Sequence, residues 1–356
     1  MEQVIKPSLK QDFLRHFDFL DFSFDQEFFK NQREEARELI QHLDFPTSKM
    51  EYWKYTRLNK VLKGNYSFKE IESSNYNLEG LSENRLVFIN GYFSEILSNV
   101  NLEEGVYFAP LSQAKEENKD LQNSFGKLYK RDEIFAVMNQ AYHQDGAVLM
   151  VQKGKDVEKE LLVLNIIDGE NIISQPRNLI HVSENAQAKV ILKTIGYNTS
   201  VSFTNMLTEV FVDKAANLEI AKIQEESPLA YQIATEQVKQ KGNSFFKINT
   251  FTFNGALVRN NLNIDLLGQH TESWLSGLYL LKDKQHVDNH TYVFHREPNC
   301  ESNELYKGIL DDQSTGVFNG KVFVHRDAQK TNAYQSNSNM LMTDNATINS
   351  KPELEI

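Results

Sequence analysis

Cysteine is almost absent from this sequence, which has one, Cys300, among 356 residues. A single thiol rules out a disulfide within the chain, and this agrees with a reducing compartment. It also excludes a four-cysteine zinc site or a four-thiolate iron–sulfur cluster built by one chain alone. Any metal cluster that the protein contacts would need ligands from a partner.

The sequence motifs of common enzyme classes are missing as well. There is no G-x-x-x-x-G-K-[ST] phosphate loop, no G-x-G-x-x-G turn, no H-E-x-x-H zinc helix, no C-x-x-C pair and no G-x-S-x-G elbow. The carboxylate pair Asp311–Asp312 lies in a turn-like run and is typical of a solvated loop. We therefore expect no catalytic residue, no cofactor-binding residue and no metal ligand in this chain.

Positive charge and long apolar runs are also scarce. The chain has 38 Lys and Arg against 49 Asp and Glu, a net charge of −11. This balance disfavours nucleic acids and anionic membranes as partners. The N-terminal stretch is polar, and no segment approaches the roughly 18 apolar residues of a membrane span. We expect a cytoplasmic protein that binds neither nucleic acid nor membrane.

The first part of the chain, residues 1–84, has the pattern of a helical domain. Ser8 and Gln11 have the spacing of a capping box ahead of an apolar run. A longer amphipathic helix is predicted from about Asp25 to Leu43, and Pro46 would prevent its continuation.

Residues 85–145 have a mixed α/β pattern and are predicted to connect this domain to a β-rich core over residues 146–356. In the core, short β-rich runs alternate with Asn, Asp, Gly and Ser. The clearest runs begin at these residues: Ser244, Leu257, Ser273, Asp288, Ser302, Gly316, Asn332 and Ala346. Successive starts lie from 13 residues apart (Ser244 to Leu257) to 16 (Leu257 to Ser273).

That spacing is too short for strand–helix–strand units, which need about 30 residues, and slightly long for a hairpin sandwich. Stacked rungs of a parallel β-helix fit it. Asparagines suit such stacks, where their amides can form ladders; the candidates are Asn260, Asn261, Asn263, Asn337 and Asn339. Periodicity alone leaves the β-helix and the sandwich open.

One segment combines metal-binding residue types: His286, His290, His295 and Cys300. Imidazole and thiolate are good ligands for zinc, copper or iron. His286 and His290 are four apart and share one face, but His295 and Cys300 lie at offsets that point elsewhere. Histidines packed in the rungs or solvated are the simpler interpretation. A metal-delivery protein that uses the His286–Cys300 segment is the alternative.

Two longer stretches resemble a known family. The first is Phe45–Thr56, FPTSKMEYWKYT. It is similar to the N-terminal P-[ST]-x-K-x-E-x-W-K-Y-T signature of SufD-type proteins. The second has these parts: DNHT at 288–291, SNELYKG at 302–308, VFNGKVFV at 317–324, AQKTNA at 328–333 and KPELEI at 351–356. It resembles the core shared by SufB and SufD.

The resemblance implies a mainly β protein with a right-handed parallel β-helix core and an N-terminal α-helical domain. It further implies a non-catalytic scaffold subunit of the SUF iron–sulfur cluster assembly complex. The partners would be a SufB-like paralogue and a SufC-like ATPase, with a transient cluster shared in the complex. In the family the Lys-Pro-x-Leu-Glu-Ile stretch leads on to a Cys-x-His pair and to a C-terminal helical domain that grips the ATPase. Those parts have no counterpart in these 356 residues, and we expect a chain that lacks them.

The last strand-like runs are expected to form a partner interface at Ala346, Ile348, Leu354 and Ile356. An uncovered strand edge has free N–H and C=O groups that invite pairing with another chain. We therefore expect a homodimer in isolation, replaced by a heterodimer when the SufB-like partner is present. A β-helix carbohydrate-active enzyme is a further alternative, because such enzymes share this architecture.

Overall fold

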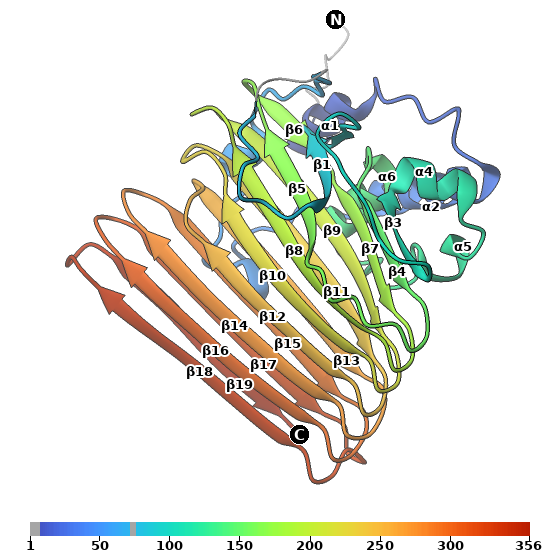
Figure 1. Cartoon of the computed structure of the whole chain (residues 1–356). Helices are drawn as coiled ribbons and strands as arrows, with labels where there is room; N and C mark the ends of the chain where they lie inside the picture. Colours follow the sequence, from blue (N-terminus) through green and yellow to red (C-terminus); the bar gives the residue numbers. More distant parts are fainter. Residues whose placement is uncertain (1–7, 72–75) are drawn as a thin grey trace, which may run out of the picture.

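The computed structural model describes residues 8–71 and 76–356, which form a β-solenoid with helices packed on one side (Figure 1). Helix α1 (Leu9–Leu14) begins with the predicted capping box. The Ser8 hydroxyl accepts the Gln11 N–H at 3.2 Å, and the Gln11 side chain accepts the Ser8 N–H at 2.9 Å. Helix α2 (Glu27–His42) confirms the predicted amphipathic helix. The remaining helices are short: η1 Arg15–Phe17, η2 Glu51–Trp53, α3 Asn59–Leu62, α4 Leu111–Glu117, α5 Leu121–Ser124 and α6 Ile134–Tyr142.

The strands form two large sheets, which we call even and odd from the numbering of their strands from β8 onward. The even sheet runs in the order β18-β16-β14-β12-β10-β8-β5-β1-β2. Its strands are β1 Asn84–Ile89, β2 Tyr92–Phe93, β5 Leu161–Ile167, β8 Gln187–Gly196, β10 Asn217–Glu225, β12 Phe245–Thr252, β14 Glu272–Leu281, β16 Glu301–Leu310 and β18 Asn332–Leu341. Every pairing in this sheet from β18 to β1 is parallel.

The odd sheet runs in the order β19-β17-β15-β13-β11-β9-β7-β4-β3, and the short β6 also pairs with β9. Its strands are β3 Val106–Pro110, β4 Ala147–Val151, β6 Ile172–Ser174, β7 Arg177–Val182, β9 Ser202–Val212, β11 Tyr231–Gln240, β13 Leu257–Leu266, β15 His286–His295, β17 Thr315–Val324 and β19 Thr347–Glu355. From β8 onward the chain alternates between the sheets, which makes a solenoid of about seven turns. The predicted parallel β-helix and its N-terminal helices are confirmed.

Each turn of the solenoid contains one even and one odd strand. The predicted spacing of 13 to 16 residues is therefore half a turn, and partners in register lie a full turn apart, as for Asn260 and Asn289 at a separation of 29. Their side chains form part of the expected amide ladder, since Asn260 donates to Asn289 at 2.9 Å. Asn337 and Asn339 instead bond to each other along β18, at 2.7 Å.

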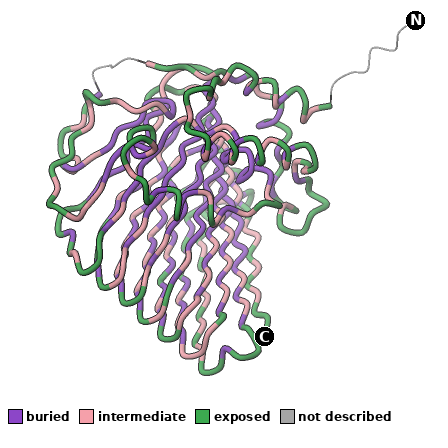
Figure 2. Tube along the Cα trace, turned by 90° about the vertical axis from the view of Figure 1, so that its right-hand side faces the viewer, coloured by how far each residue is buried: buried purple, intermediate pink, exposed green. Residues whose placement is uncertain are grey.

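Burial alternates along the strands because successive side chains point into the solenoid and out of it (Figure 2). The solenoid core is mostly apolar, with residues such as Leu218, Phe246 and Leu275 fully enclosed. On the outside, the helices cover the odd sheet: Phe13 of α1 and Phe135 of α6 both pack against Phe203 of β9. In the part of the chain that the structure describes, the even sheet carries no comparable layer of helices (Figure 1).

The sheets extend N-terminal to residue 146, where the β-rich core was predicted to start. Strand β1 pairs with β5 in parallel, and β3 pairs with β4, so both belong to the solenoid. The alternation that marks the later strands is missing in β1, because Leu86–Ile89 are buried on both faces. The division into three regions stays a prediction.

Candidate functional site

The structure separates the four residues of the candidate metal segment. His286 and His290 lie on the outer face of β15, whereas His295 points into the core, where its Nε2 lies 2.9 Å from Ser302 Oγ. Cys300 is 1% exposed, and its Sγ–H donates to the Gly268 carbonyl at 3.2 Å. Within residues 8–71 and 76–356, no three His, Cys, Asp or Glu side chains are placed to hold a metal ion together.

Cys300 occupies a repeated corner position of the solenoid. The five turns that enter β8, β10, β12, β14 and β16 do so through a residue with positive φ, such as Asn299 at 60°, followed by one small buried residue. The equivalent small residues in other turns are Ala186, Ala216, Ser244 and Thr271, which are all at most 2% exposed. The position requires a small side chain, so the packing of the corner accounts for this cysteine.

His286 and His290 belong to a different site, beneath a strap formed by residues 49–56 of the N-terminal signature. The strap crosses the outer face of the odd sheet. Thr56 donates its hydroxyl to Asp288, and His286 Nε2 lies 2.9 Å from the same hydroxyl. The strap thereby covers His286 and Asp288, which the alternation of β15 by itself would place on an open sheet surface.

A buried ion pair lies at the centre of this site. Arg259 Nη1 donates to Asp288 at 2.6 Å and to the Tyr52 carbonyl at 2.9 Å. Its guanidinium lies 3.7 Å from the centre of the Trp53 ring, a stacking contact that favours Arg over Lys. Arg259 and Asp288 are both at most 3% exposed, so the strap encloses one full positive and one full negative charge.

The electrostatics of the site follow from this pairing. Burial by itself raises the pKa of Asp288, but the charge of Arg259 and the hydrogen bond from His290 outweigh it and lower that pKa below its usual range. Burial lowers the pKa of His286 and of His290, so both imidazoles are neutral at pH 7. The site is therefore a closed, neutral arrangement, suited to holding the strap on the sheet rather than to acid–base chemistry.

The strap also reaches the last turn of the solenoid. Glu51 forms an exposed ion pair with Lys351 of β19 at 2.8 Å, and Lys351 pairs in turn with Glu353. Thr56 and Asp288 are 232 residues apart in the chain. A periodic sequence pattern cannot predict a contact between residues so far apart in the chain. The strap was indicated only by its resemblance to the N-terminal family signature.

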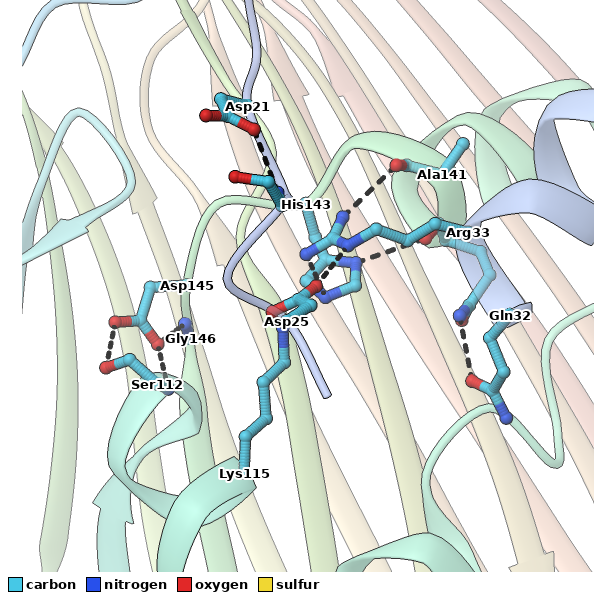
Figure 3. Close-up of polar contacts among 12 residues, drawn as sticks. Asp21, Asp25, Gln32, Arg33, Ser112, Lys115, Ala141, His143, Asp145 and Gly146 are labelled. Carbon is cyan, nitrogen blue, oxygen red and sulfur yellow. Dashed lines mark hydrogen bonds and ion pairs between the residues drawn. The ribbon is translucent and has the colours of Figure 1, made fainter. Parts of the chain in front are cut away.

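A second polar cluster joins the helices to the first turns of the solenoid (Figure 3). Arg33 of α2 donates to Asp25 at 2.7 Å, to the Ala141 carbonyl at 3.1 Å and to His143 Nε2 at 2.9 Å. Burial, together with the Arg33 and Lys115 charges, holds the pKa of His143 well below its usual range. Since Arg33 can only donate, Nε2 accepts and the ring proton lies on Nδ1, facing the Asn139 carbonyl at 3.2 Å.

Lys115 completes this cluster by pairing with Asp25 at 2.9 Å. Burial and the Arg33 charge lower the pKa of Lys115 to about 8. Nearby, Asp145 accepts the Ser112 hydroxyl at 2.7 Å and the Gly146 N–H at 2.8 Å, and burial raises its pKa. The charges of the cluster have partners from other segments of the chain, and these contacts hold α2 and α4 beside the end of α6 and the residues that lead into β4.

The core of the solenoid contains charges that apolar packing does not explain. Lys222 and Glu236 form an enclosed ion pair at 2.7 Å between the two sheets. Glu304 is 1% exposed and accepts the Thr291 hydroxyl at 2.6 Å, and burial raises its pKa to about 7. Sequence analysis missed these residues, although Leu218, Ile220, Lys222 and Gln224 share the inward face of β10 in plain alternation.

Comparison with known families decides what this solenoid is. Residues 165–356 match the SufBD core domain of the SUF system for FeS cluster assembly, and residues 10–163 match the SufBD protein N-terminal region. The two matches cover more than half of the chain. The chain belongs to the SufBD family.

Individual relatives agree with this assignment. An iron–sulfur cluster assembly SufBD family protein of Synechocystis is 30% identical over 92% of this chain and 76% of the relative. The iron–sulfur cluster assembly protein SufD of Escherichia coli is 26% identical over 90% of this chain and 77% of its own length. The chloroplastic protein ABCI7 of Arabidopsis thaliana is 27% identical over 91% of this chain and 71% of its own. These likenesses favour a SufBD protein over a carbohydrate-active enzyme or a metal-delivery protein.

The terminal turn of this SufBD solenoid contains the predicted interface residues. Ile348 and Leu354 point toward the inside of the solenoid, where no further turn of the described chain covers them, and Ile356 directly follows the strand. Leu354 is 61% exposed and Ile356 86% exposed. Ala346 differs, because it is 7% exposed and packs among the chain's own core residues.

Both sheets end at this turn, with β18 and β19 as their outermost strands. The Thr347 N–H donates to Ser314 of the neighbouring turn at 3.0 Å, so the Ile348 N–H points to the open edge. Pro352 is four residues further on, and its missing N–H is also on the open side, as expected for a proline in an edge strand.

None of the helices within residues 8–71 and 76–356 is long and apolar enough to cross a bilayer.

Proposed function

We propose that this SufBD protein is a SufD-like, non-catalytic scaffold subunit of the SUF iron–sulfur cluster assembly complex in the cytoplasm. Its partners are a SufB-like paralogue and a SufC-like ATPase. The nearest support is the family match over both parts of the chain, together with the likeness to SufD of Escherichia coli. The buried ion pairs also fit a structural subunit, since each charge is paired within the fold rather than presented to a substrate.

The observation that carries the proposed partner contact is the terminal turn. Leu354 faces inward but is exposed to solvent, and Ile356 after it is exposed as well. Val322, the register partner of Leu354 in the preceding turn, is enclosed. Exposed apolar side chains next to unpaired strand edges favour association with another β-sheet. The SufB-like paralogue is the partner of matching architecture, and the interface would include Ile348, Leu354 and Ile356, with Ala346 supporting them from the core.

A nascent iron–sulfur cluster is cargo in this scheme, and this chain does not hold it alone. The single thiol, Cys300, is enclosed at a corner and hydrogen-bonded to the backbone. Ligands from the SufB-like subunit would therefore be needed, and the cluster would be shared and transient.

The proposal is tested by co-expressing the tagged chain with the SufB-like and SufC-like proteins of its own host. We expect the SufB-like protein to co-purify stoichiometrically with the wild type and to be depleted with Leu354→Asp. Lys307→Asp, an exposed change on the outer face of β16, is the matched control and should purify with its partner. Recovery of neither Suf protein with the wild type would reject the proposed function.

Anaerobic reconstitution with iron and sulfide tests the cargo role separately. The isolated chain should develop no stable visible chromophore, because it lacks a set of accessible ligands. A chromophore of about one cluster per chain that disappears with Cys300→Ala would contradict this expectation.

A further inference from the structure

Residues 49–63 reverse the charge balance of the molecule. They contain five cations, Lys49, Lys54, Arg57, Lys60 and Lys63, and one acid, Glu51, for a local net charge of +4. The whole chain has −11, so the remaining residues have −11 − 4 = −15. Such a concentration of one sign on a protein of the opposite sign creates a local potential that selects oppositely charged partners.

The five cations are exposed and are not used by the fold. All five are exposed, and in residues 8–71 and 76–356 none of them lies in an ion pair with a carboxylate. Lys54 Nζ lies 5.4 Å from the centre of the Tyr55 ring. By contrast, the acid of this segment, Glu51, is already paired with Lys351.

The backbone of this segment keeps its cations apart from its buried residues. The segment is a succession of turns, in which the Trp53 N–H bonds to Met50 O, Thr56 N–H to Trp53 O and Leu62 N–H to Leu58 O. From residue 54 to 63 the cations recur at every third residue. The buried residues Thr56, Leu58 and Val61 alternate with them and face the protein. Lys60 lies within the single turn of α3 and Lys63 at its end, three residues apart, and all four cations are exposed to solvent.

Apolar anchors lie beside the cations. Met50, Tyr52 and Tyr55 are 55%, 47% and 44% exposed. Met50 and Tyr52 also border a cavity of about 460 Å³ whose wall includes Trp53, Phe135 and Tyr292. Three cations and three carboxylates line this cavity: Lys130, Arg259, Lys321, Asp44, Asp132 and Glu133. Its charge is therefore balanced, and it offers room for a bulky side chain rather than a second cationic surface.

We propose that residues 49–63 dock an acidic segment of a partner protein. Its carboxylates would lie along Lys54, Arg57, Lys60 and Lys63, and one aromatic or large aliphatic side chain would enter the cavity beside Tyr52. A short acidic segment fits better than a polyanion, because the −15 on the rest of the molecule repels an extended nucleic acid or an anionic bilayer. Tyrosine and methionine are also enriched in protein–protein contacts. Glu51 joins this segment to β19 through Lys351, but none of the five cations takes part in that pair, so the proposal does not depend on the partner at the terminal turn.

The probe is a fluorescein-labelled peptide of alternating glutamate and leucine with one central tryptophan. An otherwise identical peptide with glutamine in place of glutamate is its control. Fluorescence anisotropy with the full chain should show saturable binding of the acidic peptide only, weakening as salt is raised. Lys54→Glu with Arg57→Glu should weaken binding on the order of tenfold or more, and Tyr55→Ser should weaken it by several-fold.

Two exposed cations elsewhere, changed as Lys214→Glu with Lys307→Glu, give the matched control and should bind as the wild type does. Thermal midpoints of all variants identify any that fold poorly. Equal loss in both double variants, or equal binding of the glutamine peptide, would overturn the proposal. So would tighter binding of a single-stranded oligonucleotide or of phosphatidylserine vesicles than of the acidic peptide.

Discussion

The last two turns of the solenoid have the same backbone but differ in what surrounds them. Val322 of β17 and Leu354 of β19 are partners in register and both face inward. Val322 is 1% exposed because turns lie on both sides of it, whereas Leu354 is 61% exposed. Leu310 of β16 and its partner Leu341 of β18 differ in the same way, at 0% and 45%. Alternation places a side chain inward, but a second neighbouring turn is needed to bury it.

The largest contrast should appear when inward side chains are truncated. Phe318→Ala removes a fully buried ring from the penultimate turn and should lower the free energy of unfolding by about 3–5 kcal/mol. Leu354→Ala, one turn later, should change it by about 0.5 kcal/mol or less in the monomer. Urea unfolding at low protein concentration measures both. Equal losses would mean that the terminal turn is covered in solution.

The strap provides a second contrast, between its buried and exposed ion pairs. Arg259→Met leaves the Asp288 carboxylate enclosed without its main partner, and this should cost about 3–5 kcal/mol of stability. Lys351→Met breaks only exposed ion pairs, with Glu51 and Glu353, and its unfolding midpoint should match that of the wild type. A large effect of Lys351→Met would show that the strap holds the last strand in place.

The pH dependence of stability should distinguish the core from the terminal turn. Burial raises the pKa of Glu304 in the folded state to about 7, from an ordinary value of 4.5. Its contribution to stability is therefore complete below about pH 4.5 and is lost as the pH rises through 7. The loss amounts to about 3 kcal/mol.

Glu304→Gln should remove that part of the slope. Burial also raises the pKa of Glu226, to about 8, so stability still depends on pH in this variant. The quantity to compare is therefore the difference in unfolding free energy between variant and wild type at each pH. Glu355→Gln in β19 is the matched control for removal of a carboxylate. A wild-type profile for Glu304→Gln would contradict a protonated Glu304 in the core.

Self-association should show the smallest free-energy change. Ile348→Pro removes an N–H that points to the open edge, and it should weaken a homodimer on the order of tenfold while the earlier turns stay folded. Thr347→Pro is the contrasting variant, because it removes the bond to Ser314 within the chain and should lower stability. Light scattering over a micromolar concentration series gives the dimer constant. A wild-type chain that stays a monomer would rule out the homodimer.

Local sequence patterns predicted the later strands of the solenoid and the longest helix, α2. The predicted starts at Ser244, Leu257 and Ser302 are within one residue of β12, β13 and β16. Inward and outward alternation, corner residues with positive φ and the Ser8 capping box are local features, and a local pattern reports them directly. Alternation also separated His295 from His286 and His290 correctly.

The tertiary structure alone decided which polar residues work together. Arg259, Asp288 and Thr56 meet because β13 and β15 pair in a register that sets Arg259 beside Asp288, and the strap then crosses both strands. Pairs such as Lys222–Glu236 depend on which residues of two sheets face each other across the core. Whether a terminal side chain is buried depends on a neighbouring turn, not on its own strand. These contacts join segments that are distant in the chain. Their energy depends on how completely the whole fold encloses them, and a local sequence pattern contains no information about that enclosure.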